Sequence, residues 1–139
     1  MTRLETNFVA LVAVQAAHSI EEYLGRLWEV FPPAAFVTGL VSEDRRFGFI
    51  VINVALLLFG LWCFFWPVRH RWPAVGVFIG IWIVIEIING IGHPLWTLQK
   101  QAYTPGVATA PVLLVLALSL LWQLRKQSGH QGPSHITSN

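Results

Sequence analysis

The chain has 139 residues, of which 55% are hydrophobic and only 12% charged, and its formal net charge is +2. Its mean hydropathy is +0.59. Ordinary soluble domains carry about 25% charged residues, so the composition excludes that class and indicates a chain whose solvent is a lipid bilayer. The length accommodates about four spans of roughly 20 residues each and no separate soluble domain. Nucleic-acid binding is not expected, because the few basic residues are explained by membrane topology.

The first predicted span covers residues 8–28. It ends before Pro32 and Pro33, because proline lacks an amide donor and clashes with the preceding turn. Neither a strongly basic stretch nor a small-residue cleavage site precedes the span, so we do not expect it to be removed as a signal peptide. Residues 34–41 are too few to cross a bilayer, and we predict a re-entrant or interfacial connector there.

Three further spans are predicted at residues 47–68, 72–96 and 107–122. The third span of the chain opens at Trp72 and Pro73, since a proline in the first helical turn gives up no hydrogen bond. The fold class expected is therefore an all-α membrane protein, a four-transmembrane-helix bundle formed by residues 1–122.

The remaining residues, 123–139, are polar and contain Gly, Ser and His, a composition that predicts a disordered tail. His130 and His135 are expected to be solvated there rather than to act as ligands. The single cysteine, Cys63, can form no intrachain disulfide and is expected to be a buried apolar thiol.

Basic residues in the loops predict the orientation in the membrane. Five lie on one side and three on the other, which favours a cytoplasmic location for both termini. The simplest host is a prokaryotic inner membrane. Tryptophans near the predicted span ends are expected to be interfacial anchors. The basic residues on the predicted cytoplasmic side are Arg3, Arg69, Arg71, Arg125 and Lys126, and those on the other side are Arg45, Arg46 and Lys100. The predicted anchors are Trp28 and Trp96 at the outer surface and Trp66, Trp72 and Trp122 at the inner surface.

Two predicted spans carry a polar stripe on one helical face. The spacings are i, i+3, i+4 in the first span and i, i+3, i+7 in the third, and each places its residues on a single face. At about 1.5 Å rise per residue, the stripes overlap in the membrane half away from the cytoplasm, and Asn53 lies at a similar depth. The stripes are His18, Glu21 and Glu22 in the first span and Glu86, Asn89 and His93 in the third.

Such residues are unfavourable in lipid. One charged side chain at the bilayer centre costs about 2.5–3.5 kcal/mol, so three ionised glutamates would cost up to about 10 kcal/mol, comparable with the whole stability of a typical domain. The polar groups should therefore face the bundle interior and pair with one another. Intramembrane ionisable residues of this kind predict a functional site.

Three short motifs resemble those of a known family. Residues 18–22 read H-x-x-E-E, residues 89–93 read N-x-x-x-H, and residues 103–109 read Y-x-P-G-x-x-T. In this order over roughly residues 8–122, they resemble the HXXEE family of small membrane proteins. That family has no established activity and is suspected of containing integral membrane enzymes. The resemblance therefore implies a site without a reaction, at His18, Glu21, Glu22, Asn89 and His93.

The residue types themselves favour a metal site. Two imidazoles and up to three carboxylates on facing helices form a ligand set that suits zinc, manganese or iron. A partial set would leave a coordination position open for water or substrate. The spacing matches neither the H-E-x-x-H nor the E-x-x-H metal motif. The candidate ligands are His18, Glu21, Glu22, Glu86 and His93.

A metal-free mechanism stays open beside it. Glu21 or Glu22 could act as general acid or base with a histidine as proton partner. Either version fits hydrolysis or isomerisation of a lipid-like substrate. Asn89 suits an orienting role, and Tyr103 lies in a turn with a candidate role in the site. The catalytic candidates are thus Glu21, Glu22, Asn89 and Tyr103.

Three alternatives to this hydrolase or isomerase stay open. A proton-coupled transporter or channel component would need oligomerisation, because the polar residues do not continue into the inner half. Residues 21–26 also satisfy the E-E-x-x-x-R motif of CAAX-type glutamate proteases, but the partner motif F-x-x-x-H is missing. The third is a structural membrane protein. Membrane lipids are the expected partners in every case, and a homo-oligomer is possible in each.

Two smaller expectations concern packing. Arg26 is expected to pair with Glu22 or with Glu29 along the helix. Four glycines of the third span are expected to permit close helix packing. They are Gly76, Gly80, Gly90 and Gly92.

Overall fold

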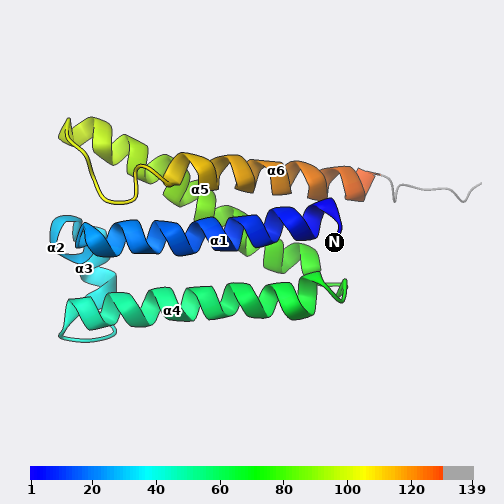
Figure 1. Ribbon diagram of the computed structural model, residues 1–139, viewed down its shortest axis with the longest axis horizontal. Helices are drawn as coiled ribbons and strands as arrows, with labels where there is room; N and C mark the ends of the chain where they lie inside the picture. The colour runs from blue at the N-terminus through cyan, green and yellow to red at the C-terminus, as the bar shows by residue number, and fades with distance from the viewer. Residues whose placement is uncertain (130–139) are drawn as a thin grey trace, which may run out of the picture.

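The computed structural model describes residues 1–129, and it is all-helical within that range, as predicted. Four long helical segments lie side by side in Figure 1. Two short helices, α2 (Leu27–Val30) and α3 (Pro32–Gly39), connect the first long segment to the second. The long segments are α1 (Arg3–Leu24), α4 (Arg45–Cys63) continued by the π-helix η1 (Phe64–Val68), α5 (Val75–Lys100) and α6 (Ala110–Gly129).

The helices alternate in direction. The N-terminus, the turn at residues 69–74 and the last turns of α6 lie at one end of the bundle, whereas α2, α3 and the loop at residues 101–109 lie at the other (Figure 1). We call these the terminal end and the loop end. This order brings the His18 turn of α1 next to the His93 turn of α5.

Local signals explain where α1 begins and ends. Thr2 and Glu5 form a capping box, in which each side chain binds the other residue's backbone amide, so the helix starts at Arg3. It ends at Leu24 because Arg26 adopts a left-handed conformation with φ 51°. The predicted single span at residues 8–28 is therefore a long helix followed by the separate short helix α2.

Prolines act differently at three places. Pro32 opens α3, so the predicted connector is helical, and its fixed φ suits the first position of a helix. Pro67 lies inside η1, where wider π-type winding accommodates its missing amide donor. Pro73 precedes α5, which starts at Val75, slightly later than predicted, and runs on to Lys100.

The last helix is longer than predicted. We expected a span ending at residue 122 and a disordered tail from residue 123, but α6 continues to Gly129. Gln123, Arg125 and Lys126 are good helix formers despite their polarity, so the helix extends past its apolar part. The rest of the predicted tail, with His130 and His135, lies outside the described residues.

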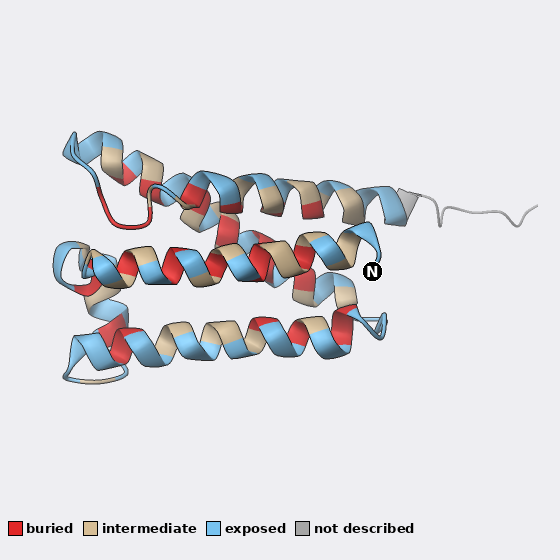
Figure 2. Cartoon of the chain, in the orientation of Figure 1, coloured by how far each residue is buried: buried red, intermediate tan, exposed pale blue. Residues whose placement is uncertain are grey.

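Two segments are long and apolar enough to cross a membrane. An 18-residue stretch within Arg45–Val68 has a mean hydropathy of 2.4 and one within Val75–Lys100 has 2.1, and within residues 1–129 only these two segments are that apolar and long. Figure 2 shows much exposed surface along the long helices. Large apolar side chains lie on it, including Leu58, Ile88 and Val115, each at least 60% exposed. An apolar exterior of this kind supports association with a membrane.

The buried apolar residues form two clusters. The larger one joins all four long segments toward the terminal end, with Phe8, Trp82 and Leu120 fully buried, and it contains the free Cys63, as expected. The smaller one, at the loop end, consists of Leu27, Trp28, Phe49 and Trp96.

This second cluster corrects part of the tryptophan prediction. Trp28 and Trp96 are only 5% and 9% exposed, so they pack inside the protein instead of anchoring at an outer interface. Both rings pack against other aromatic rings, those of Phe49 and Phe31. The three predicted inner anchors, Trp66, Trp72 and Trp122, are exposed.

Only one of the four glycines proposed for close packing in α5 has that role. A Cβ on Gly90 would lie 2.5 Å from the Leu114 Cβ and 3.1 Å from the Ala110 carbonyl oxygen, so α6 contacts the α5 backbone there. Gly76, Gly80 and Gly92 have open space around the corresponding position. The prediction was therefore wrong for these three.

This difference predicts opposite effects of two matched substitutions in α5. Gly90→Ala should destabilise the folded protein by about 1–3 kcal/mol, because the added methyl overpacks the α5–α6 contact. Gly80→Ala should be neutral or stabilising by up to about 1 kcal/mol, since alanine is the better helix former. Thermal unfolding in detergent measures both, and equal destabilisation by the two substitutions would contradict the assigned helix contact.

Candidate functional site

Three of the predicted ligands meet inside the bundle. His18 and Glu22 come from consecutive turns of α1, and His93 comes from α5. The Nε2 atoms of His18 and His93 lie 3.3 and 3.1 Å from the same oxygen, Oε1 of Glu22. One ligand atom from each residue lies within 4.8 Å of the others, and all three residues are buried. We call this set the three-donor site.

Aromatic rings enclose the three-donor site on the loop side. The imidazoles of His18 and His93 are 4.8 Å apart and nearly perpendicular. Phe31 and Trp96 each lie with their ring centroids within about 6.5 Å of His93 and pack against each other at 4.4 Å. Such walls keep bulk water away from the donors and strengthen electrostatic interactions among them.

Glu21, which precedes Glu22 in the chain, holds the loop before α6 in place through hydrogen bonds. Its Oε1 accepts hydrogen bonds from the Tyr103 hydroxyl at 2.6 Å and the Ala108 amide at 3.0 Å. Its Oε2 accepts from the Thr109 amide at 3.0 Å and the Thr109 hydroxyl at 2.6 Å. A carboxylate at the start of a helix is also favoured by the helix dipole. Glu21 is therefore an anchor for α6.

Thr109 links this anchor to the three-donor site. Because its hydroxyl proton is donated to Glu21, its oxygen accepts from Nδ1 of His18, 2.7 Å away. The proton on Nδ1 leaves Nε2 of His18 as the atom facing Glu22, and this buried nitrogen makes no hydrogen bond. A bare nitrogen lone pair facing a carboxylate is favourable only when a positive charge lies there, either a cation or a second proton on the imidazole.

Small residues of the loop make room for the rings. Gly106 has φ 92°, and a Cβ there would lie 2.6 Å from the His93 ring and 2.8 Å from the His18 ring. Pro105 packs so closely on Gly25 that a Cβ at Gly25 would lie 2.3 Å from the proline ring. The Y-x-P-G-x-x-T motif thus has a physical reason at each defined position.

A second polar group lies beside the three-donor site and is distinct from it. Glu86 is fully buried, and its Oε2 accepts from Asn89 at 3.3 Å. With its amide nitrogen toward Glu86, Gln15 donates to both carboxylate oxygens at 3.1 Å, and its amide oxygen lies 3.2 Å from the Ser19 hydroxyl. Ser19 donates its hydroxyl proton to Oδ1 of Asn53 on α4, 2.7 Å away. We call this set the Gln15 network, and it connects α1, α4 and α5.

The structure therefore sorts the predicted residues into three groups. His18, Glu22 and His93 form the three-donor site. Glu21 and Tyr103 hold the loop. The remaining two, Glu86 and Asn89, pair with each other within the Gln15 network and are not members of the three-donor site.

Three contributing residues were not among the predicted site residues. Thr109 and Gly106 lie inside the third motif, so the motif itself was a signal for both. Gln15 stands three residues before His18, on the same face of α1, and that spacing could have indicated it. Arg26 pairs with Glu29 at 3.6 Å, the second of its two expected partners.

The donor set fits a divalent cation. Ligand bonds of about 2.0–2.2 Å in a tetrahedral site put neighbouring ligand atoms roughly 3.3–3.6 Å apart. The distances from the two histidine Nε2 atoms to Oε1 of Glu22, 3.3 and 3.1 Å, are close to that range. Thr109 supplies the second contact that usually orients a ligating imidazole. Nδ1 of His93 is buried without a partner, so that ring lacks the equivalent contact.

The Glu21 anchor predicts a measurable titration of Tyr103. The hydrogen bond to Glu21 raises the pKa of the Tyr103 phenol to about 12, because ionisation breaks that bond and places two negative charges together. Glu21→Gln should return the pKa toward 10, the ordinary value for tyrosine. Stability from this contact is present below pH 10 and is lost as the pH rises through 12.

Absorbance titration in a Tyr23→Phe background isolates the signal, since Tyr23 is the other of two tyrosines. An unchanged Tyr103 titration in Glu21→Gln would disprove the anchor.

Comparison with known proteins agrees with this arrangement of motifs. The model of a family described as "Protein of unknown function with HXXEE motif" matches residues 9–121. No curated protein and no solved structure matches the chain. The match includes the three-donor site, the Glu21 anchor and the loop that it holds, and it confirms the resemblance inferred from the motifs. The chain belongs to the HXXEE family.

Proposed function

We propose that the protein is an integral membrane enzyme whose three-donor site holds a divalent cation and acts on a lipid-like substrate by hydrolysis or isomerisation. One observation carries the proposal. Nε2 of His18 is fully buried, is fixed toward Glu22 by Thr109, and makes no hydrogen bond there. A bound cation would satisfy that nitrogen, the Glu22 carboxylate and His93 together.

Three protein ligands would leave one coordination position open. A cation held by His18, Glu22 and His93 would supply an acidified water or a polarised substrate oxygen, as in known sites with two histidines and one glutamate. The chain's own contribution is positioning, because Glu21 and Thr109 fix the His18 ring and the aromatic walls exclude water. Zinc, manganese and iron all suit this donor set.

A cavity near the site supports a small-molecule substrate. It has a volume of about 430 Å³ and is lined in part by Trp96, Lys100, Tyr103 and Pro105. Trp96 lies between the two, because it lines this cavity and its ring centroid is 6.4 Å from that of His93. Its mixed apolar and polar lining suits an amphiphile that enters from the lipid or the outer water layer.

We further propose that α1 and α6 cross the membrane together with the two more apolar segments. In the structure α6 packs against α5 and α1 packs against α4, and residues of all four segments belong to the larger buried cluster. In this arrangement the terminal end faces the cytoplasm, in agreement with the basic residues Arg3, Arg69 and Arg71 there. A prokaryotic inner membrane is the simplest location.

A proton-coupled transporter is the second candidate, and the Gln15 network favours it. Buried glutamate joined to amides and hydroxyls can carry protons within a membrane. The cluster toward the terminal end is apolar, with Phe8, Leu11 and Trp82 fully buried. Because no polar route continues through that cluster in the described residues, we rank transport below enzyme activity.

A protease and a purely structural protein receive less support. A glutamate protease of the CAAX type would use Arg26 beside the paired glutamates, but Arg26 is exposed and pairs with Glu29. A purely structural role would make the three donors a packing device. It predicts loss of stability on substitution without any bound ion.

Metal content tests the enzyme proposal. Detergent-purified protein loaded with zinc, manganese or iron should hold about one ion per chain, and His18→Ala or Glu22→Gln should lose it, because each removes a ligand of the three-donor site. Glu86→Gln should retain the ion. Elemental analysis of the purified proteins measures this.

His70→Ala is the matched control, since it removes an exposed imidazole remote from the site. Wild type without a stoichiometric ion would refute the metal proposal. Equal loss in Glu86→Gln would move the site to the Gln15 network.

Thiol labelling tests the four-span topology. In a Cys63→Ala background, which removes the single native cysteine, Ser42→Cys should react with a membrane-impermeant maleimide in intact cells. His70→Cys should react only after permeabilisation, because the turn at residues 69–74 lies at the opposite end of the bundle. The reverse pattern would overturn the orientation, and equal labelling of both would overturn the number of spans.

A further inference from the structure

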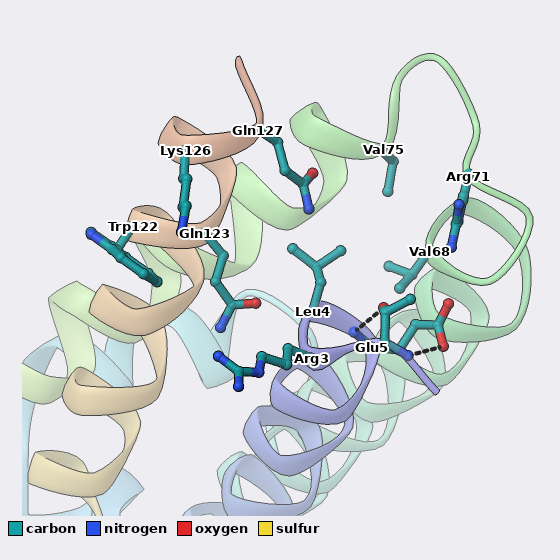
Figure 3. Close-up of a pocket in the computed structure, with 11 residues that line it drawn as sticks. Arg3, Leu4, Glu5, Val68, Arg71, Val75, Trp122, Gln123, Lys126 and Gln127 are labelled. Carbon is teal, nitrogen blue, oxygen red and sulfur yellow. Dashed lines mark hydrogen bonds between the residues drawn. The ribbon is translucent and has the colours of Figure 1, made fainter. Parts of the chain in front are cut away.

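A cleft of about 720 Å³ opens at the terminal end of the bundle, away from the three-donor site. Figure 3 shows its walls, which come from the start of α1, the turn at residues 69–74 with the first residue of α5, and the last turns of α6. Segments far apart in the sequence thus meet around one opening. No residue of the proposed enzyme site lines it.

The cleft is positively charged. Arg3, Arg71 and Lys126 line it, against the single carboxylate of Glu5. That carboxylate accepts the Thr2 amide at 2.9 Å in the capping box of α1, as Figure 3 shows. Three cationic side chains and one carboxylate, which is already hydrogen-bonded, give the opening a net positive charge. It therefore favours a negatively charged ligand.

Two of the cations are available to a ligand. Within residues 1–129, the guanidinium groups of Arg3 and Arg71 make no hydrogen bond and no ion pair. Both side chains are exposed. A guanidinium presents a planar set of donors that matches two oxygens of a phosphate, so arginines in this situation suit phosphate recognition.

The remaining lining is apolar. Leu4, Val68 and Val75 contribute to the wall between the charged groups, and Val68 is only 2% exposed. Trp122 lies at the edge, with the Lys126 ammonium 5.3 Å from its ring centroid. Cations beside apolar walls match the two parts of a phospholipid at the membrane surface, where the phosphate adjoins the glycerol and the acyl chains.

We propose that this cleft binds the phosphate group of an anionic phospholipid at the cytoplasmic surface of the membrane. Arg3 and Arg71 contact the phosphate from two sides, and Leu4 and Val75, which are partly exposed, contact the glycerol and upper acyl region. The site is separate from the proposed enzyme centre and needs no metal. A lipid bound there would contact both the start of α1 and the turn before α5.

Lipid binding to purified protein tests this directly. Native mass spectrometry in detergent should detect one bound short-chain phosphatidylglycerol with at least about tenfold preference over phosphatidylcholine. Arg3→Gln and Arg71→Gln should each weaken that binding about fivefold, the effect of removing one cation near anionic lipid. Arg71→Lys should retain most of it.

Arg69→Gln is the matched control. It removes the same charge from the same turn, and Arg69 is exposed but does not line the cleft. Binding unchanged in Arg69→Gln and weakened in Arg71→Gln supports the site. An equal loss in both would show general attraction to the basic surface and would overturn the proposal, as would equal binding of the two lipids.

Further measurements distinguish a lipid from a free phosphate compound, and the cleft from the three-donor site. Inorganic phosphate and glycerol phosphate should not displace the lipid at equal concentration, and displacement would assign the cleft to a free phosphate compound instead. His18→Ala should leave lipid binding unchanged, so failure of the metal proposal does not affect this test. Unaltered thermal unfolding of the Arg3 and Arg71 variants verifies that they remain folded.

Discussion

The four hydrogen bonds accepted by the Glu21 carboxylate are the contacts on which the candidate site depends. They join α1 to the start of α6 at the loop end of the bundle. Because Thr109 donates its hydroxyl proton to Glu21, it can only accept from His18, and this directs the other imidazole nitrogen to Glu22. One carboxylate therefore positions a helix and also sets the orientation of a neighbouring ring. Hydrogen bonds to an ionised carboxylate are stronger than those between neutral groups.

The polar groups form one layer between two apolar clusters. Within the layer, the three-donor site joins α1 to α5, and the Gln15 network joins the same helices to α4. A buried polar group without a partner is costly, so sliding one helix past another would break several such pairs. The layer can thus define the register of helices whose apolar surfaces alone would tolerate slippage. The cleft at the terminal end is lined by other residues, so it is separate from the three-donor site.

Much of the fold could be predicted because hydropathy and helix signals are local. The four long segments, the break near Pro32 and the turn near Arg71 follow from apolar runs, prolines and charges. The predicted helix boundaries were less accurate, as at the end of α6. Hydropathy predicts the end of the apolar segment, but polar residues that favour helix extend the helix beyond it. Trp28 and Trp96 were assigned to an interface because their positions suit one; their burial depends on aromatic partners from other helices.

By itself, the sequence determined the helical class, the polar layer and its principal members, since spacing along a helix fixes which side chains share a face. It also determined the family, through motifs that the family comparison confirms. Only the tertiary structure divided those residues by role. Glu21 and Glu22 are adjacent in the chain, yet one binds the start of α6 and the other faces two imidazoles, because neighbouring positions on a helix point about 100° apart. Which partner each one meets depends on how the helices pack, and local sequence does not contain that information.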